Sequence, residues 1–210
     1  FTLVGLADVE VKEARERVRS AIQNSGLEFP HNKRITVNLA PADLPKDSGR
    51  FDLPIALGIL AASGQIDAAQ LAGHEFAGEL SLSGELRPVR GALAMSLALH
   101  AGGVVTRLVL PPGSAEEAAL VPDAQVFSAR HLLDLVQHFR PADSEAAPQD
   151  PTAESGWSRV ANTVQTQPLP YPAMHATSAW AQRLPRPGSL PWCVCENTQV
   201  GVAQQHTRQA

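Results

Sequence analysis

Short apolar runs and amphipathic stretches alternate along the first 140 residues. The run 34–39 is rich in β-branched residues, which favour strands. The stretch that follows Asp8 instead carries apolar residues at helical spacing, from Val11 to Ile22. A chain that alternates the two patterns packs helices against sheets. The sequence therefore predicts an α+β layer structure over residues 1–140.

Turn residues separate the expected elements. The expected strands cover 1–6, 34–39, 75–82, 85–89, 104–110 and 124–127. The expected helices follow Asp8 and cover 53–63, 91–101, 114–120 and 129–139. Ser83 and Gly84 are expected to join the third and fourth strands as a hairpin, and Asp52 and Ser114 to cap their helices. Helices 53–63 and 91–101 are mostly apolar, so both are expected in the core.

The composition changes near Pro141. Residues 141–210 hold 9 of the 17 prolines, but Val, Leu, Ile and Phe supply only 8 of these 70 residues. So few core-forming side chains cannot offset the conformational entropy lost on folding. We therefore expect a domain over residues 1–140, followed by a proline-rich linker and disordered tail over residues 141–210.

Charge and composition exclude several classes of protein. The formal net charge is −4, which excludes a strongly basic nucleic-acid-binding chain, though not a local basic face. No apolar run approaches the roughly 18 residues of a membrane span, and no secretory signal precedes Phe1. Cys193 and Cys195 are spaced poorly for a disulfide. These features predict a cytoplasmic protein that does not enter a membrane.

Three long segments carry a specific resemblance. They are VGLADVEVKEARERVRSAIQNSGLEFP (4–30), RITVNLAPADLPKDSGRFDLPIALGILAASGQI (34–66) and GELSLSGELRPVRGAL (78–93). Together they resemble the N-terminal domain of the magnesium-chelatase-like proteins, the ComM/YifB competence family, and the resemblance covers residues 1–140.

The resemblance implies a two-layer fold similar to the proteolytic domain of Lon and to the second domain of ribosomal protein S-five, with helices against one sheet. Family members begin earlier, with one or more extra strands, so Phe1 is expected to follow a truncation. Members continue into an AAA+ ATPase module that binds ATP and Mg²⁺, form hexamers and drive DNA branch migration during recombination of transforming DNA. This chain is thus expected to be a non-catalytic domain of such an ATPase, or else a magnesium-chelatase-type scaffold that binds a partner subunit.

A Lon-like fold also raises the possibility of a serine peptidase, in which a Lys amine activates a Ser hydroxyl. An ungapped match to Lon-like enzymes puts Arg50 at the Ser position and Leu93 at the Lys position. Ser48 lies two residues earlier, and no Lys follows Lys46. Because Leu93 cannot accept a proton, no catalytic residue is expected. A divergent peptidase that uses Ser48 is the alternative enzyme.

Nucleotide and metal motifs are absent from the sequence. A P-loop requires a Gly-Lys pair, and none occurs. No H-E-x-x-H or paired Cys motif indicates a metal site either. We therefore expect no ATPase, cofactor or metal in this chain. The histidines of the domain, for which surface or helix-cap roles are expected, are His31, His74, His100, His131 and His138.

Several cations are candidates for contact with DNA or a partner, because phosphate binding requires clustered positive charge. Lys12, Arg15 and Arg19 share one face of the first helix, but acidic residues on the same helix dilute their field. A solvated face with ion pairs such as Glu13–Arg17 is the competing interpretation. The other candidates are Arg87 and Arg90 near the hairpin exit, and Arg50, which could instead pair with Asp47 or Asp52.

The last part of the chain departs from the family pattern from about Gly156 onward. We hypothesise that this segment is a frame-shifted or otherwise aberrant sequence, because it lacks Lys and periodicity and is rich in Pro. The alternative is a divergent tail that binds a partner through Trp157, Trp180 and Trp192.

Overall fold

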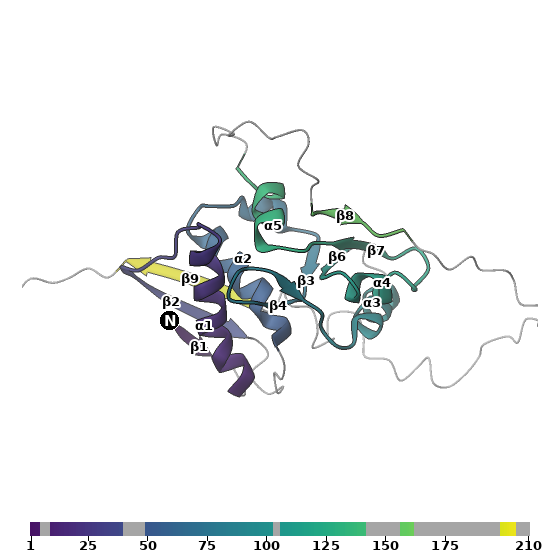
Figure 1. Cartoon of the computed structure of the whole chain (residues 1–210), viewed down its shortest axis with the longest axis horizontal. Helices are drawn as coiled ribbons and strands as arrows, with labels where there is room; N and C mark the ends of the chain where they lie inside the picture. Colours follow the sequence, from purple (N-terminus) through teal and green to yellow (C-terminus); the bar gives the residue numbers. More distant parts are fainter. Residues whose placement is uncertain (5–8, 40–48, 103–105, 142–155, 162–197, 205–210) are drawn as a thin grey trace, which may run out of the picture.

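The computed structural model describes residues 1–4, 9–39, 49–102, 106–141, 156–161 and 198–204 (Figure 1). The described residues form helices and mixed sheets, which confirms the predicted α+β class. Their strands fall into two sheets and a short hairpin, whereas a single sheet was expected from the resemblance.

The first sheet has the strand order β1-β2-β9. Strand β1 (Thr2–Val4) runs parallel to β2 (Lys33–Leu39). Strand β9 (Thr198–Gln204) lies antiparallel along the other edge of β2. Helix α2 (Asp52–Ala62) packs next to β9, and α1 (Val9–Asn24) packs against α2 (Figure 1). Helix α1 buries Ala14, Val18, Ala21 and Ile22, the apolar face predicted from their spacing.

The second sheet has the strand order β3-β6-β7-β8. Strands β3 (His74–Phe76), β6 (Arg107–Leu110) and β7 (Gln125–Ser128) are parallel, and β8 (Ser158–Arg159) pairs antiparallel with β7. Helix α3 (Ala92–Ala101) packs against α4 (Ser114–Ala118), and α5 (Leu132–His138) follows β7 (Figure 1). Two 3₁₀ turns, η1 (Gly49–Phe51) and η2 (Ala68–Leu71), flank α2.

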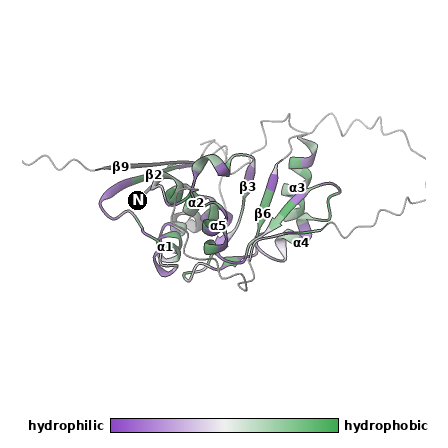
Figure 2. Cartoon of the chain, turned by 90° about the horizontal axis from the view of Figure 1, so that it is seen from above, coloured by the Kyte–Doolittle hydropathy of each residue, from purple (hydrophilic) through white to green (hydrophobic). Residues whose placement is uncertain are grey.

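Two clusters of buried apolar residues form the core. The first cluster lies among α1, α2, β2 and α5 and includes Phe76 and Val109. The second cluster lies among α3, α4 and the second sheet and includes Leu108, Leu110 and Val126. Strand β6 contributes to both clusters, because successive side chains of a strand point to opposite faces. Figure 2 shows this strand as apolar over most of its length.

The two predicted helix caps differ from the structure. Phe51 is the N-cap of α2, and Asp52 is the first helical residue, whose carboxylate accepts hydrogen bonds from Arg17 and from the Leu80 N–H. Gly113 is the N-cap of α4, while the Ser114 hydroxyl bonds both the N–H and the carbonyl of Val89. In both places a distant tertiary partner takes the side chain that sequence alone assigned to the local backbone.

The hairpin expected over residues 75–89 is much shorter in the structure. Only β4 (Glu79–Leu80) and β5 (Leu86–Arg87) pair, and the turn includes Gly84 as predicted. The first expected strand divides at Ala77 and Gly78, because β3 joins the second sheet and Gly78 bonds the backbone of Arg50 and Leu53. The start of α2 therefore separates β3 from the hairpin.

Helix α3 is less buried than predicted. Helix α2 is buried along most of its length, as expected, but α3 buries only Ala92, Met95 and Ser96. Leu97 on the same helix is 51% exposed. A small-residue composition did not distinguish a helix enclosed on all sides from one that packs through a single face.

The prediction of a disordered tail over residues 141–210 is wrong for two short segments. Strand β8 pairs with β7, and Trp157 beside it packs against the first cluster. Strand β9 pairs along the full length of β2. Composition averaged over seventy residues missed both, because one aromatic anchor or one free strand edge is enough to order a short segment. Among the described residues, no helix is both long and apolar enough to cross a membrane.

Candidate functional site

The start of α2 holds a buried ion pair. Asp52 is fully buried, and the Arg17 side chain is 21% exposed. Arg17 Nε donates to Asp52 Oδ2 at 2.7 Å, and Arg17 Nη2 donates to Oδ1 at 3.1 Å. The Leu80 N–H donates to the same Oδ2 at 3.1 Å. One carboxylate thus connects α1, α2 and the β4–β5 hairpin.

Burial raises the pKa of the Asp52 carboxyl above its usual value, although the hydrogen bond and charge of Arg17 act in the opposite direction. Glu13 lies 3.8 Å from Arg17 across one helical turn, so the predicted Glu13–Arg17 pair is present at the solvent side of the same guanidinium. The described hydrogen bonds to the Asp52 carboxylate come from Arg17 and the Leu80 N–H, and they hold α1, α2 and the hairpin together.

The positions that resemble a peptidase dyad lie on η1 and α3. Arg50 is half-buried on η1, with its guanidinium 5.8 Å from the centroid of the Phe51 ring. The described hydrogen bonds of the Asp52 carboxylate come from Arg17 and Leu80, and Asp47, the other partner considered for Arg50, lies outside the described residues. Leu93 is half-buried in the first turn of α3, where its N–H donates to Glu117 Oε1 at 3.2 Å. Ser48, Lys46 and Asp47 lie outside the described residues.

The candidate contact cations lie on α1, on η1 and around the β4–β5 hairpin. Arg15 is exposed and pairs with the neighbouring Glu16 at 3.1 Å, while the guanidinium of Arg19 lies 5.8 Å over the Phe29 ring. Arg87 lies 3.8 Å from Glu79, and Arg90 is exposed in the turn before α3. Lys12 is in α1, but its side chain is outside the described part of the structure.

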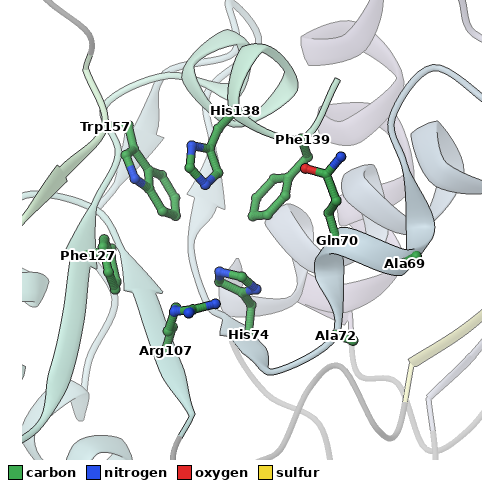
Figure 3. Close-up of a pocket in the computed structure, with 9 residues that line it drawn as sticks. All are labelled: Ala69, Gln70, Ala72, His74, Arg107, Phe127, His138, Phe139 and Trp157. Atoms are coloured by element: carbon green, nitrogen blue, oxygen red, sulfur yellow. The ribbon is translucent and has the colours of Figure 1, made fainter. Parts of the chain in front are cut away.

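A cleft of about 520 Å³ opens where β3, β6, β7, α5 and the Trp157 segment meet (Figure 3). Trp157 stacks on His138 with ring centroids 4.2 Å apart and on Phe127 at 5.1 Å. Phe139 packs edge-on against His74, with centroids 5.1 Å apart. The Gln70 amide and the exposed Arg107 complete the lining. Aromatic walls with a few polar groups are typical of ligand sites.

His74 is the buried polar group of this cleft. It is 6% exposed, and its Nδ1 is buried without a hydrogen-bond partner among the described residues. Burial, followed by the positive charge of Arg107, lowers the pKa of His74 below its usual value. The same two causes, in the same order, lower the pKa of His138. Arg107 therefore faces two imidazoles that favour the neutral form.

Sequence reasoning missed this cleft. It expected surface or cap roles for the histidines, whereas His74 is the first residue of a strand whose three residues are all buried. For His131 the predicted cap role is confirmed: His131 is the N-cap of α5, its Nδ1 accepts the Leu133 N–H, and Asp134 completes a capping box. No spacing in the sequence linked His74 to Arg107, His138 and Trp157.

Within the described residues, no group of three or more His, Cys, Asp or Glu side chains is placed to hold a metal ion.

The described elements define an α+β domain of helices packed on mixed sheets. Residues 1–114 match the family described as "Subunit ChlI of Mg-chelatase". The chain belongs to this family, within its ComM/YifB group, as the sequence predicted.

Curated relatives support the same assignment. "Competence protein ComM" of Haemophilus influenzae is 54% identical over 137 residues, which is 65% of this chain and 26% of the relative. "Uncharacterized protein YifB" of Salmonella typhimurium is 52% identical over 133 residues, 63% of this chain and 26% of the relative. The Escherichia coli protein of the same name is 48% identical over 132 residues, with 63% and 26% covered. The chain thus spans about a quarter of the length of these relatives.

Proposed function

We propose that residues 1–140 are a non-catalytic, Lon-like accessory domain of a ComM-type, magnesium-chelatase-like AAA+ protein. In this proposal the domain serves assembly, DNA engagement or regulation of a cytoplasmic hexamer that moves along DNA. The observation that carries the proposal is the 54% identity to a protein named for competence, which extends over the whole domain. Identity at this level over 137 residues supports a shared role for the domain as well as a shared fold.

Two features of the domain support a non-catalytic role. A hydrocarbon side chain, Leu93, stands at the position of the general base in the Lon-like resemblance, and a hydrocarbon cannot accept a proton. Asp52, two residues after Arg50, accepts hydrogen bonds from Arg17 and Leu80 that hold elements together.

The resemblance implies ATP and Mg²⁺ for such a protein, but the residues of this chain do not fit them. No Gly-Lys pair is present to form a phosphate-binding loop. In the proposal, nucleotide hydrolysis therefore belongs to the remaining part of a ComM-type protein, and no step of it is assigned to this domain.

A domain exchange tests the proposal. Residues 1–137 of this chain would replace the matching segment of the Haemophilus influenzae ComM protein, with a version lacking that segment as the control. We expect the exchanged protein to form the same oligomer and to migrate DNA branches at a rate similar to the parent, and the deleted version to be defective in one or both. Activity of the exchanged protein no better than that of the deleted version would overturn the proposal.

A second candidate function is a scaffold for a chelatase partner subunit, favoured by the match to "Subunit ChlI of Mg-chelatase". Its test is stable co-purification of this chain with the other subunits of a magnesium chelatase.

The peptidase alternative has its own test, in which a serine-reactive phosphonate probe labels the chain and Ser48→Ala abolishes the labelling. We expect no such labelling.

A further inference from the structure

The cleft at Trp157 is not used by the proposed function. Its volume, about 520 Å³, lies within the range of roughly 300–1,000 Å³ that is usual for small-molecule sites. Figure 3 shows the side chains of Trp157, His138, Phe139, His74 and Arg107 arranged around one open space. Four different segments of the chain supply them, so the cleft exists only in the folded domain.

The charges around this space have one sign. None of the nine described residues that line the cleft is acidic, and Arg107 makes no ion pair with an acidic side chain in the described part of the chain. The guanidinium is close enough to His74 and His138 to disfavour a positive charge on both imidazoles. An anion placed among these groups would be attracted by Arg107. Its negative charge would also offset the repulsion between Arg107 and a protonated His74 or His138 ring.

His74 contributes a buried polar ring to the cleft. It is 94% buried, and its Nδ1 is shielded from the open space. Backbone hydrogen bonding to Ala72 and Leu71 acts on the ring from the η2 side, and a neutral imidazole carries only one N–H. Arg107 is therefore the donor that an oxyanion in the cleft would meet.

We propose that this cleft binds a small organic anion, in which a carboxylate or phosphate group is joined to a flat apolar body. Arg107 pairs with the oxyanion, and the neutral ring of His74 lies beside it. The flat body packs against the rings of His138, Phe139 and Trp157, which provide apolar surface.

Trp157 supplies the measurement, because it lines the cleft. In a Trp180→Phe, Trp192→Phe background, Trp157 is the only tryptophan, and its fluorescence reports on the cleft. Phenyl phosphate and phenylacetate are the anionic probes, and benzyl alcohol is the neutral probe with the same ring. Inorganic phosphate tests the anionic group alone.

We expect a saturable fluorescence change with at least one of the two anionic probes, and the tighter of the two identifies the preferred group. Arg107→Gln should weaken that binding about tenfold or more, because a charged hydrogen bond is lost. Arg107→Lys should retain most of it. Arg34→Gln, which removes an exposed cation from β2 in the other sheet, is the matched control and should bind like the parent.

Circular dichroism and urea unfolding of each variant separate loss of binding from loss of folding. The proposal is overturned if neither anionic probe produces a saturable change at millimolar concentration. It is equally overturned if a folded Arg107→Gln variant binds as well as the parent, if benzyl alcohol binds as tightly as the anionic probes, or if inorganic phosphate alone binds as tightly as phenyl phosphate.

Discussion

Arg17 and Asp52, which lie 35 positions apart in the chain, are joined by two parallel hydrogen bonds of 2.7 and 3.1 Å. The carboxylate is fully buried, and its remaining described hydrogen bond comes from the Leu80 backbone. A two-point guanidinium–carboxylate pair fixes orientation as well as distance. The pair therefore sets the angle at which α1 crosses the start of α2.

Replacement of Asp52 by Ala should be strongly destabilising. The change leaves the Arg17 guanidinium and the Leu80 N–H without their acceptor, and breaking a buried pair costs about 3 kcal/mol. Urea unfolding followed by circular dichroism measures the effect. Glu16→Ala removes the partner of the exposed Arg15 and should change the free energy of unfolding by less than about 0.5 kcal/mol.

The double variant Asp52→Ala, Arg17→Met tests whether the cost comes from the pair. Met retains an apolar stem but no charge, so the double variant should lose less free energy of unfolding than the sum of the two single variants. Strict additivity of the two losses would contradict an energetic role for the pair.

The lowered pKa of His74 predicts that the stability of the domain depends on pH. Its folded-state pKa lies below the usual value of 6.5, because burial and then Arg107 disfavour the charged ring. The unfolded chain therefore takes up a proton near pH 6.5 that the folded chain takes up only at lower pH. The contribution of His74 to stability is thus complete above pH 6.5 and is lost as the pH falls through the folded-state pKa.

Urea unfolding at about pH 7.5 and about pH 5.5 measures this contribution, which can reach a slope of about 1.4 kcal/mol per pH unit for one proton. His74→Phe keeps a ring beside Phe76 and Phe139 and should reduce the loss of stability on acidification. Leu97→Gln, at an exposed position of α3 without a titratable group, is the control and should leave the slope unchanged. An identical slope in His74→Phe and in the parent would contradict the prediction.

A side chain at Gly84, in the hairpin turn, should clash with its neighbours. Its φ is +96°, and a Cβ there would overlap Ser25 Oγ and approach His131 Cε1 to 2.8 Å. Gly64 has a similar φ of +78° but open space around the same position. Gly64→Ala should therefore cost about 1 kcal/mol for backbone strain, and Gly84→Ala about 2–3 kcal/mol for strain and overlap. Equal losses in the two variants, measured by urea unfolding, would show that the contacts with Ser25 and His131 add nothing.

Trp157 should contribute to the stability of the whole domain. Its ring is half-buried and packs on Phe127, His138 and Phe139. Trp157→Ala should lower the free energy of unfolding by about 2 kcal/mol, a reduced value for a ring that is not fully buried. Arg159→Ala, at an exposed position two residues later, should have little effect. A stable Trp157→Ala variant would mean that residues 1–140 fold without this segment.

Much of the fold could be predicted because its helices and strands are locally encoded. The apolar spacing that begins at Val11 gave α1, and the β-branched run gave β2, each to within a residue or two where described. The errors lie where a distant partner competes with a local one. Asp52 and Ser114 are good cap residues in isolation, but Arg17 and the Val89 backbone use their side chains instead.

The cleft could not be predicted for a related reason. His74, Arg107, His138 and Trp157 come from separate elements, and no spacing in the sequence relates them. The order of strands in the second sheet is what brings His74 next to Arg107. Low hydrophobicity after Pro141 predicted a disordered tail, in which Trp157 was expected at most to bind a partner, whereas Trp157 forms part of the cleft wall.

Strand β6 has a further consequence for how the domain unfolds. Val109 belongs to the first cluster, whereas its neighbours Leu108 and Leu110 belong to the second. Neither cluster can come apart without disturbing a strand that the other requires, so the two halves share one cooperative transition. Amide protons on both sides of β6 should accordingly exchange with solvent through the same rare global opening, and a weakness in either half would shorten the lifetime of both.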